Sequence, residues 1–402
     1  MDISNLNEPQ KEAVLYNSGP LLILAGAGSG KTKVLTTKVA FLIEEMDVSP
    51  YNILAITFTN KAAKEMKERL NLLIGDLSKN IQVSTFHSFG LRLLRENCDV
   101  LGYSSNFVIM DSDDSLTVVK KIIKDMGFDP KVYNPRAIRN KISSCKNEMI
   151  MPNDYEKYAV SDYEKIVLKV YEKYEEKLRK NNSVDFDDLL LLPIRLFREN
   201  ADILNRYQDR FKYVLVDEYQ DTNEAQYILT KLISSKYRTI TCVGDDSQSI
   251  YSFRGANYKN ILNFEKDYPD AKSILLEQNY RSTQTILNAA NEVIKNNKAR
   301  KDKSLWTANG EGEKIKYYRA YNERDEAQYV IRKVKELIVR GASYQDIAVL
   351  YRTNAQSRIL EEEMLKENLP YRVVGSFYFY SRKEIKDLIA YLRLIHNPKD
   401  NV

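Results

Sequence analysis

The feature that most constrains the fold is a glycine-rich stretch between two segments of different local character. The apolar run Leu21–Ala25 has the composition of a buried strand, and a helical pattern begins at Lys31. The stretch that joins them, AGAGSGKT, covers Ala25–Thr32 and matches the P-loop pattern. A P-loop needs this context, because its glycines bring backbone amides close to phosphate groups at the start of a helix. The stretch therefore predicts a phosphate-binding α/β fold, and a structural glycine turn is the competing interpretation.

Two side chains at the end of this loop would complete a nucleotide site. Lys31 can reach the β- and γ-phosphates, and the Thr32 hydroxyl can bind a magnesium ion. The backbone amides of the loop would hold the phosphates. The predicted phosphate-binding residues are Ala27, Gly28, Ser29, Gly30, Lys31 and Thr32.

A P-loop also needs a carboxylate on a neighbouring strand, and the segment YVLVDE at Tyr213–Glu218 supplies two. Asp217 would hold magnesium, and Glu218 would polarise the attacking water. Alternatively, the two acids only end a strand on its solvent side. Together with the P-loop, this segment predicts an NTPase of the P-loop class and nothing more specific.

The chain alternates apolar strands with helices, except in one long internal segment. Further strands are expected at 52–58, 81–85 and 239–244, and this pattern favours a parallel sheet covered on both faces. Residues 106–183 are rich in Lys, Glu and Tyr, show helical periodicity and contain no convincing strand.

A second series of strands and helices begins near Ser273. Its later strands are expected at 314–320, 346–352 and 370–375. We therefore divide the chain into a split parallel-sheet domain (1–105 and 184–275), an inserted helical subdomain (106–183) and a second parallel-sheet domain (276–402).

The composition excludes several classes of protein. The 402 residues carry a net charge of +5, which alone decides little about a polyanionic partner. The three cysteines lie far apart, which argues against a disulfide scaffold, and two histidines cannot form a histidine-rich metal site. The N-terminus lacks the apolar core of a signal peptide, and no apolar run reaches membrane-spanning length. We expect a cytoplasmic protein without a membrane partner.

Seven motifs occur in one order along the chain. They are LNEPQKEAV near the N-terminus, TFTNKAA (57–63), STFHSF (84–89), DEYQDTN (217–223), VGDDSQSIYSFRGA (243–256), EQNYRST (277–283) and LYRTNAQSR (350–358). This ordered set resembles superfamily 1 DNA helicases of the UvrD/PcrA/Rep family, and it spans essentially the whole chain. Any single motif is a weak signal, whereas the full set in order is specific.

The resemblance implies two RecA-like parallel-sheet domains, the second incomplete, with ATP and Mg²⁺ bound between them. Gln10 would read the adenine edge, Tyr280 would stack on the adenine ring, and Gln248 would sense the γ-phosphate. Arg281 matches the family's arginine finger, which stabilises charge on the transferred phosphoryl group. A surface salt bridge is the alternative for Arg281. Lys33 stands where these helicases commonly carry an arginine that contacts nucleotide.

On the DNA side, the resemblance implies base stacking and contacts with the sugar-phosphate backbone. The matching aromatic residues are Phe58, Tyr251 and Phe253. The matching backbone-contacting residues are Thr59, Asn60, His87, Arg254, Arg352 and Asn354. Core packing is the alternative for each aromatic residue, and a capping or core role is the alternative for His87.

These motifs together predict the ATP-dependent motor of a DNA helicase or translocase. The resemblance implies 3′ to 5′ movement, with single-stranded DNA and 3′-tailed duplex DNA as partners. Because no match to the family's late motifs precedes Val402, we expect a truncated form with weak activity. The alternatives are an ATP- and DNA-binding module without turnover and the motor part of a helicase–nuclease. Repair, plasmid replication and fork restart all remain open, and the preference for DNA over RNA rests on the resemblance.

Overall fold

The computed structural model describes residues 1–251, 255–297, 301, 303–374 and 383–399. It forms two compact units, of which the first comprises Met1–Gly312 with Arg393–Val402 and the second comprises Glu313–Leu392. None of the helices in the described ranges is long and apolar enough to cross a bilayer.

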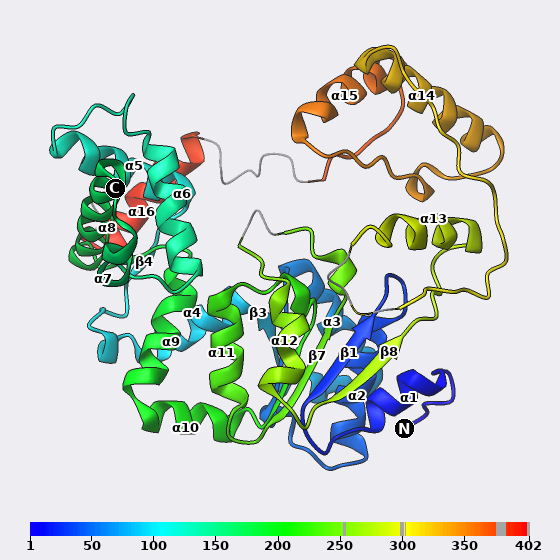
Figure 1. Ribbon diagram of the computed structural model, residues 1–402, viewed down its shortest axis with the longest axis horizontal. Coiled ribbons are helices and arrows are strands. Elements are labelled where there is room, and N and C mark those ends of the chain that lie inside the picture. Colours follow the sequence, from blue (N-terminus) through cyan, green and yellow to red (C-terminus); the bar gives the residue numbers. More distant parts are fainter. Residues whose placement is uncertain (252–254, 298–300, 302, 375–382, 400–402) are drawn as a thin grey trace. The chain divides into compact units, whose positions relative to one another are not determined.

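A six-stranded sheet forms the centre of the first unit, and every pairing within it is parallel (Figure 1). This confirms the parallel sheet predicted for the first half of the chain. Because all strands run the same way, their carboxyl ends meet at one edge. The strands, in spatial order, are β3 (Gln82–Thr85), β2 (Ile53–Thr57), β6 (Tyr213–Val216), β7 (Thr239–Gly244), β1 (Leu21–Ala25) and β8 (Lys272–Leu276).

Alternate side chains of the strands enter two separate hydrophobic cores. In β1, Leu22 and Leu24 belong to one core, whereas Leu21 and Ile23 belong to the other. The second core is completed by α1 (Glu8–Leu15), α2 (Lys31–Glu44) and α3 (Asn60–Ile74). The first core is completed by α4 (Phe86–Asn97), α9 (Asp188–Glu199), α10 (Ala201–Arg210), α11 (Glu224–Ser234) and α12 (Lys259–Asp267). The sheet is therefore covered on both faces, as its continuous apolar strands predicted.

The segment predicted to be helical has its own core. It contains α5 (Ser112–Asp125), α6 (Pro135–Asn147), α7 (Pro152–Tyr155) and α8 (Asp162–Lys180). The prediction of no strand was wrong at its two ends, where β4 (Val108–Ile109) pairs with β5 (Ser183–Val184). Two residues per strand are too few to produce a recognisable apolar run. The end of α16 (Lys383–His396) contacts this segment through an ion pair between Arg393 and Asp114 at 2.6 Å.

The strand near Ser273 does not begin a second sheet. It is β8, which pairs with β1 at the edge of the first sheet. Its Ile274 and Leu276 side chains are buried in the same core as Leu21 and Ile23, which explains the pairing. The helix α13 (Gln284–Ile294) follows within the first unit. The domain boundaries that we placed in the sequence remain predictions.

The second unit contains helices but no strand among its described residues. Its helices α14 (Glu323–Val339) and α15 (Ser357–Lys366) are joined by an ion pair between Arg324 and Glu363 at 3.3 Å. No described residue of the strands expected at 314–320, 346–352 and 370–375 is in a strand, so the described part of the second unit contains no second parallel sheet. A strand needs neighbours for its backbone groups, and side chains such as Tyr317 (88% exposed) and Leu350 (93% exposed) lack a covering layer.

Candidate functional site

The predicted nucleotide residues of the first unit gather at the carboxyl edge of its sheet. The P-loop follows β1, Asp217 and Glu218 follow β6, Gln248 follows β7, and Tyr280 with Arg281 follow β8. Ligands of open parallel sheets bind at this edge, outside the ends of the strands. The topology therefore brings four sequence motifs to one place.

The P-loop has the backbone conformation that an anion site needs. Gly28 and Gly30 both have positive φ values, 67° and 85°, which a side chain would make costly. Gly30 is the N-cap of α2 and provides no side-chain cap. The amides of the first helical turn, including those near Lys31 and Thr32, are therefore suited to phosphate oxygens. The loop fits the predicted nucleotide.

The carbonyl groups of the loop are bonded to surrounding protein. Gln10 donates its amide to the Ser29 carbonyl at 2.9 Å, and the Tyr280 N–H donates to the Gly28 carbonyl at 2.9 Å. The Asn279 amide donates to the Ala27 carbonyl. The C=O and N–H groups of a trans peptide point in opposite directions. The N–H groups of the loop therefore point away from the residues that bind its carbonyl groups.

Asn279 was missed in the sequence, although it lies inside the EQNYRST motif. Its side chain is 2% exposed, and its Oδ1 accepts the N–H groups of Arg281 at 2.8 Å and Ser282 at 2.7 Å. A Cβ on Gly28 would lie 2.7 Å from the Asn279 amide nitrogen, so the close approach requires glycine. Asn279 thus joins the P-loop to the residue predicted as arginine finger.

The two acids after β6 differ in exposure and conformation. Asp217 is buried, and this burial together with the Glu218 carboxylate raises the pKa of Asp217 to about 6. Glu218 has a φ of 51°, in the left-handed region that costs a non-glycine residue energy and often marks functional positions. Its Oε2 lies 3.1 Å from the Lys31 Nζ. The structure therefore joins the P-loop lysine to the predicted catalytic acid.

A second residue missed in the sequence, Gln220, connects the ends of β6 and β7. Its amide donates to Glu218 Oε2 at 2.9 Å, and its Oε1 accepts the Asp245 N–H at 2.9 Å. A Cβ on Gly244 would lie 2.5 Å from this oxygen, so the glycine permits the contact. Asp221 lies beside it, with its pKa raised to about 6 by burial and Glu218. Gln220 is signalled only by its place in DEYQDTN.

Gln248 lies in the short helix η6 (Asp246–Gln248) at the end of β7. Its amide donates to Asp245 Oδ2 at 2.7 Å. Since Asp245 also bonds to Gln220, the predicted γ-phosphate sensor and the predicted catalytic acid are connected through two intermediate residues. This is the kind of polar network through which phosphate occupancy can change a distant contact.

Tyr280 and Gln10 lie close to each other, as a shared adenine pocket would require. Asn7, the N-cap of α1, donates to the Tyr280 hydroxyl at 2.9 Å and its N–H bonds to Gln10 Oε1 at 3.1 Å. The Tyr280 ring remains 49% exposed and available for stacking. Lys33 donates to the Asn5 carbonyl at 2.9 Å. Arg281 is exposed, and no carboxylate among the described residues pairs with it, which disfavours the salt-bridge alternative.

The predicted DNA-stacking residues that the structure describes also meet at this edge. The rings of Phe58 and Tyr251 have centroids 5.4 Å apart and are tilted by 36°. Thr59 caps α3 by accepting the Ala62 N–H at 3.1 Å, and Asn60 is exposed at the first position of that helix. The geometry leaves a pair of aromatic faces beside a helix N-terminus, which suits a base and its phosphate.

His87 has an aromatic neighbour that was missed in the sequence. The Phe186 ring stacks on the His87 ring with centroids 4.0 Å apart, and it is 54% exposed. Burial lowers the pKa of His87 to about 4, so the imidazole is neutral at pH 7. Exposed, stacked aromatic rings of this kind are suited to unpaired bases. Only the contact with His87, which is distant in sequence, reveals Phe186.

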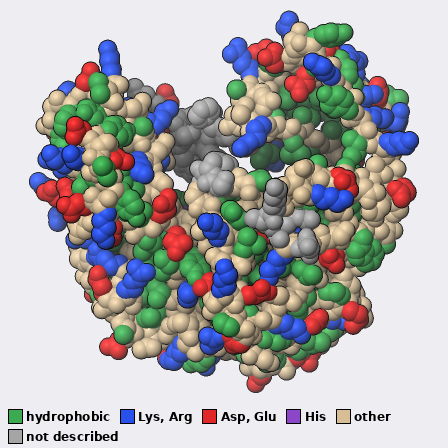
Figure 2. All heavy atoms as spheres, in the orientation of Figure 1, with side chains coloured by type: hydrophobic (Ala, Val, Ile, Leu, Met, Phe, Trp, Pro, Cys, Tyr) green, Lys and Arg blue, Asp and Glu red, His purple; other side chains and the backbone are tan. Residues whose placement is uncertain are grey.

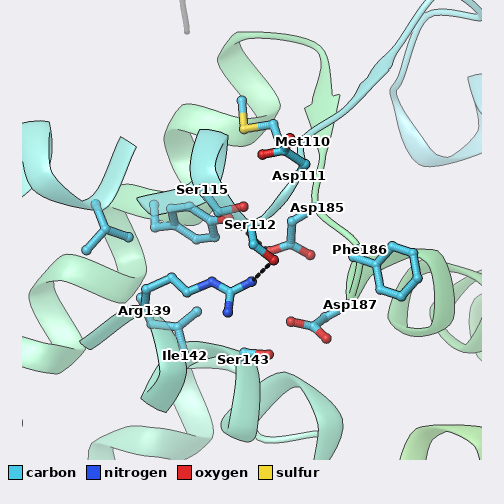
Figure 3. A pocket seen from close by; sticks show the side chains of 12 residues that line it. Met110, Asp111, Ser112, Ser115, Arg139, Ile142, Ser143, Asp185, Phe186 and Asp187 are labelled. Atoms are coloured by element: carbon cyan, nitrogen blue, oxygen red, sulfur yellow. Dashed lines mark hydrogen bonds between the residues drawn. The ribbon is translucent and has the colours of Figure 1, made fainter. Parts of the chain in front are cut away.

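Behind Phe186 lies a small polar pocket in the helical segment (Figure 3). Its volume is about 10 Å³, which is room for about one water molecule. Arg139 donates to Ser112 Oγ at 3.0 Å across it, while the Phe186 ring points away from the pocket. The pocket is therefore too small for a nucleotide.

The remaining predicted DNA residues lie in the second unit or outside the described residues. Arg352 and Asn354 lie in the second unit, where both are exposed and Asn354 opens the short helix η9 (Asn354–Gln356). Phe253 and Arg254 lie outside the described residues. Their predicted contacts with DNA remain predictions, as do those of the other residues named above.

Comparisons with known proteins match both halves of the chain. Residues 6–269 match the family model of the UvrD/REP helicase N-terminal domain, and residues 274–402 match that of the UvrD-like helicase C-terminal domain. The chain is 54% identical over 400 residues to an ATP-dependent DNA helicase PcrA of Staphylococcus aureus (strain Mu50), covering 100% of this chain and 55% of that protein. For a PcrA of Staphylococcus epidermidis the identity is 53%, with the same coverage. The chain thus spans about half the length of these relatives.

Proposed function

Since this chain belongs to the UvrD/REP helicase family, we propose that its first unit is an ATP-hydrolysing motor that moves on single-stranded DNA. The observation that carries the proposal is the contact of Lys31 with Glu218, at the sheet edge where Phe58 also meets Tyr251. A phosphate site and a stacking site at the ends of strands of one sheet would allow ATP hydrolysis to change the contacts with DNA.

The P-loop amides, Lys31 and Thr32 would hold the phosphates, and Asp217 with Thr32 would hold Mg²⁺. When bound, Mg²⁺ supplies positive charge that offsets charge developing on the phosphate oxygens. No group of three or more metal-ligating side chains occurs among the described residues, so nucleotide and water oxygens would complete the coordination. The raised pKa of Asp217 fits a buried carboxylate that awaits a cation.

Glu218 is the general base in this proposal. Its Oε2 contacts Lys31 at 3.1 Å and the Gln220 amide at 2.9 Å, so the carboxylate is oriented before substrate arrives. It would accept the proton of the attacking water at Oε2 as Lys31 turns to the phosphates. Arg281, which is held beside Gly28 by Asn279, would stabilise charge on the transferred phosphoryl group.

Phe58, Tyr251 and Phe186 would stack on bases, a contact that tolerates any sequence and is worth about 1–3 kcal/mol per base. Thr59, Asn60 and His87 would contact the backbone. On the face shown in Figure 2, Lys and Arg are interspersed with Asp and Glu, so the charge on this face is mixed. We infer 3′ to 5′ movement on single-stranded DNA and unwinding of 3′-tailed duplexes.

The test is ATP turnover by the wild-type chain, Glu218→Gln and Glu65→Gln, the last being a control on an exposed helix face. We expect Glu218→Gln to bind ATP with unchanged affinity and to lose roughly 10²–10⁴-fold in kcat. Glu65→Gln should match the wild type. A wild-type rate equal to that of Glu218→Gln would instead support a binding module without turnover.

A further inference from the structure

A buried lysine outside the seven motifs lies beside two acids of the VGDDSQ segment. The Lys303 side chain is 4% exposed, and its Nζ forms ion pairs with Asp245 and Asp246, whose side chains are 3% and 0% exposed. Charges this deeply buried are costly unless paired, and removal of one partner leaves the others uncompensated. The positions of the two aspartates therefore depend on the lysine.

Asp245 is the junction of two hydrogen-bond paths in the proposed ATP site. Its Oδ2 accepts the Gln248 amide at 2.7 Å, and its N–H donates to Gln220 Oε1 at 2.9 Å. Gln220 in turn donates to Glu218 Oε2 at 2.9 Å. The position of Asp245 consequently sets the orientation of both the proposed phosphate sensor and the proposed general base.

Lys303 also belongs to a segment that is bonded to the stretch carrying Arg281. The Ser304 N–H donates to Glu277 Oε1 at 2.8 Å, and the Asn279 N–H donates to the Trp306 carbonyl at 2.7 Å. Leu305 packs on the P-loop, since a Cβ on Gly26 would lie 2.0 Å from its Cδ2. One lysine thus stands between the end of β7 and the segment that follows β8.

We propose that Lys303 is a positioning residue for ATP hydrolysis. Its ammonium fixes Asp245, and through it the Gln248 and Gln220 amides. The residues that follow it, Ser304 to Trp306, are bonded to the stretch that carries Arg281. Without this cation, the carboxylates of Asp245 and Asp246 repel each other. Asp245 is then no longer held in place, and its hydrogen bonds to Gln248 and Gln220 become less ordered. Lys303 touches neither water nor phosphate in this account, which rests on the proposed function.

The experiment compares Lys303→Met, Lys303→Arg and the control Lys301→Met, whose side chain pairs instead with Glu265 at 2.5 Å. We expect Lys303→Met to lower kcat about tenfold or more with KM for ATP changed by less than about threefold, the pattern of a lost transition-state interaction. Lys303→Arg should recover most of kcat, because it keeps the charge. Lys301→Met should behave as wild type.

Hydrogen exchange provides a readout that does not need turnover. Lys303→Met should raise exchange at both 245–250 and 277–282, whereas Lys301→Met should leave both unchanged. If Lys303→Met does not fold, the double variant Lys303→Met with Asp246→Asn takes its place, because it keeps the net charge of the cluster. The double variant should still show slow turnover and raised hydrogen exchange.

The outcomes separate this inference from the proposed function. A Lys303→Met protein with wild-type kcat, or with wild-type exchange in both segments, overturns the role of Lys303 while the motor stands. A wild-type chain without ATP turnover overturns the motor, and the exchange result then decides alone whether Lys303 fixes the two segments.

Discussion

Lys31 and Lys146 both face carboxylates in the first unit, yet their surroundings differ. Lys146, near the end of α6, is 0% exposed and pairs with Glu175, Asp185 and Asp188 at 2.7–2.8 Å. Burial opposes its charge, but these carboxylates raise the pKa of Lys146 well above its usual value. Among the described residues, Lys31 forms an ion pair with Glu218 alone, and the two side chains are 12% and 36% exposed.

The neighbours of each lysine sharpen this contrast. Around Lys146, Asp185 and Asp188 accept each other's backbone N–H at 3.0 and 2.9 Å. Around Lys31, Glu218 holds a strained φ, and Asp221 Oδ1 has no hydrogen-bond partner within the described part of the chain. The first cluster joins α6 and α8 of the inserted segment to the start of α9, while the second keeps polar groups available for a ligand. Local consistency is given up where function is proposed.

The largest expected effect concerns the structural cluster. Lys146→Met should lower the free energy of unfolding by about 3–5 kcal/mol, because it leaves buried carboxylates without their cation. Urea denaturation at pH 7.5 measures the change. The matched control is Lys120→Met, because Lys120 is an exposed residue of α5. This substitution should change the free energy of unfolding little. A loss for Lys146→Met no larger than for the control would remove the distinction between the clusters.

Burial of the Asp217 carboxylate should make the free energy of unfolding depend on pH. The pKa of Asp217 is raised to about 6, so the folded state takes up a proton more readily than the unfolded state. Wild-type stability should therefore fall relative to Asp217→Asn as pH rises from about 4 through 6, by up to about 3 kcal/mol. Unfolding curves without Mg²⁺ test this. A stability difference independent of pH would show that Asp217 ionises without cost.

A smaller effect is expected for Phe186, which we propose binds DNA although it lies beside residues that stabilise the fold. Phe186→Ala should weaken binding of single-stranded DNA by about 1–3 kcal/mol while the neighbouring Lys146 cluster keeps the fold stable. Fluorescence anisotropy with a labelled oligonucleotide gives both Kd values. Tyr158→Ala is the control, because Tyr158 is an aromatic residue of the helical segment with a similar exposed fraction, 55%. Equal weakening by both variants would contradict a stacking site at Phe186.

The smallest expected effect is the stability change for Lys31→Met. Its loss should stay within about 1 kcal/mol, because Glu218 is partly hydrated and does not need the lysine for folding. The same urea curves serve here. A loss comparable to that of Lys146→Met would make Lys31 a structural residue as well.

The sheet and the P-loop could be predicted because their signals are local. Apolar runs such as Leu21–Ala25 identified the strands, and the glycine pattern identified the loop. Gln220, Asn279 and Lys303 could not be found this way, since each acts through partners that only the strand order brings close. The prediction of strands in the second unit was wrong because it relied on local signals alone. Apolar runs such as 346–352 resemble strands locally, but a strand is stable only when it pairs with another strand.

The central claim is that one sheet edge holds a catalytic ATP site coupled to a DNA site. Steady-state ATP hydrolysis by this chain, with and without a single-stranded oligonucleotide, tests it most directly, with Glu218→Gln as the background. We predict turnover above that background and stimulation by DNA, reduced in Tyr251→Ala. Nucleotide binding with turnover no faster than in Glu218→Gln, at any DNA concentration, would contradict the claim.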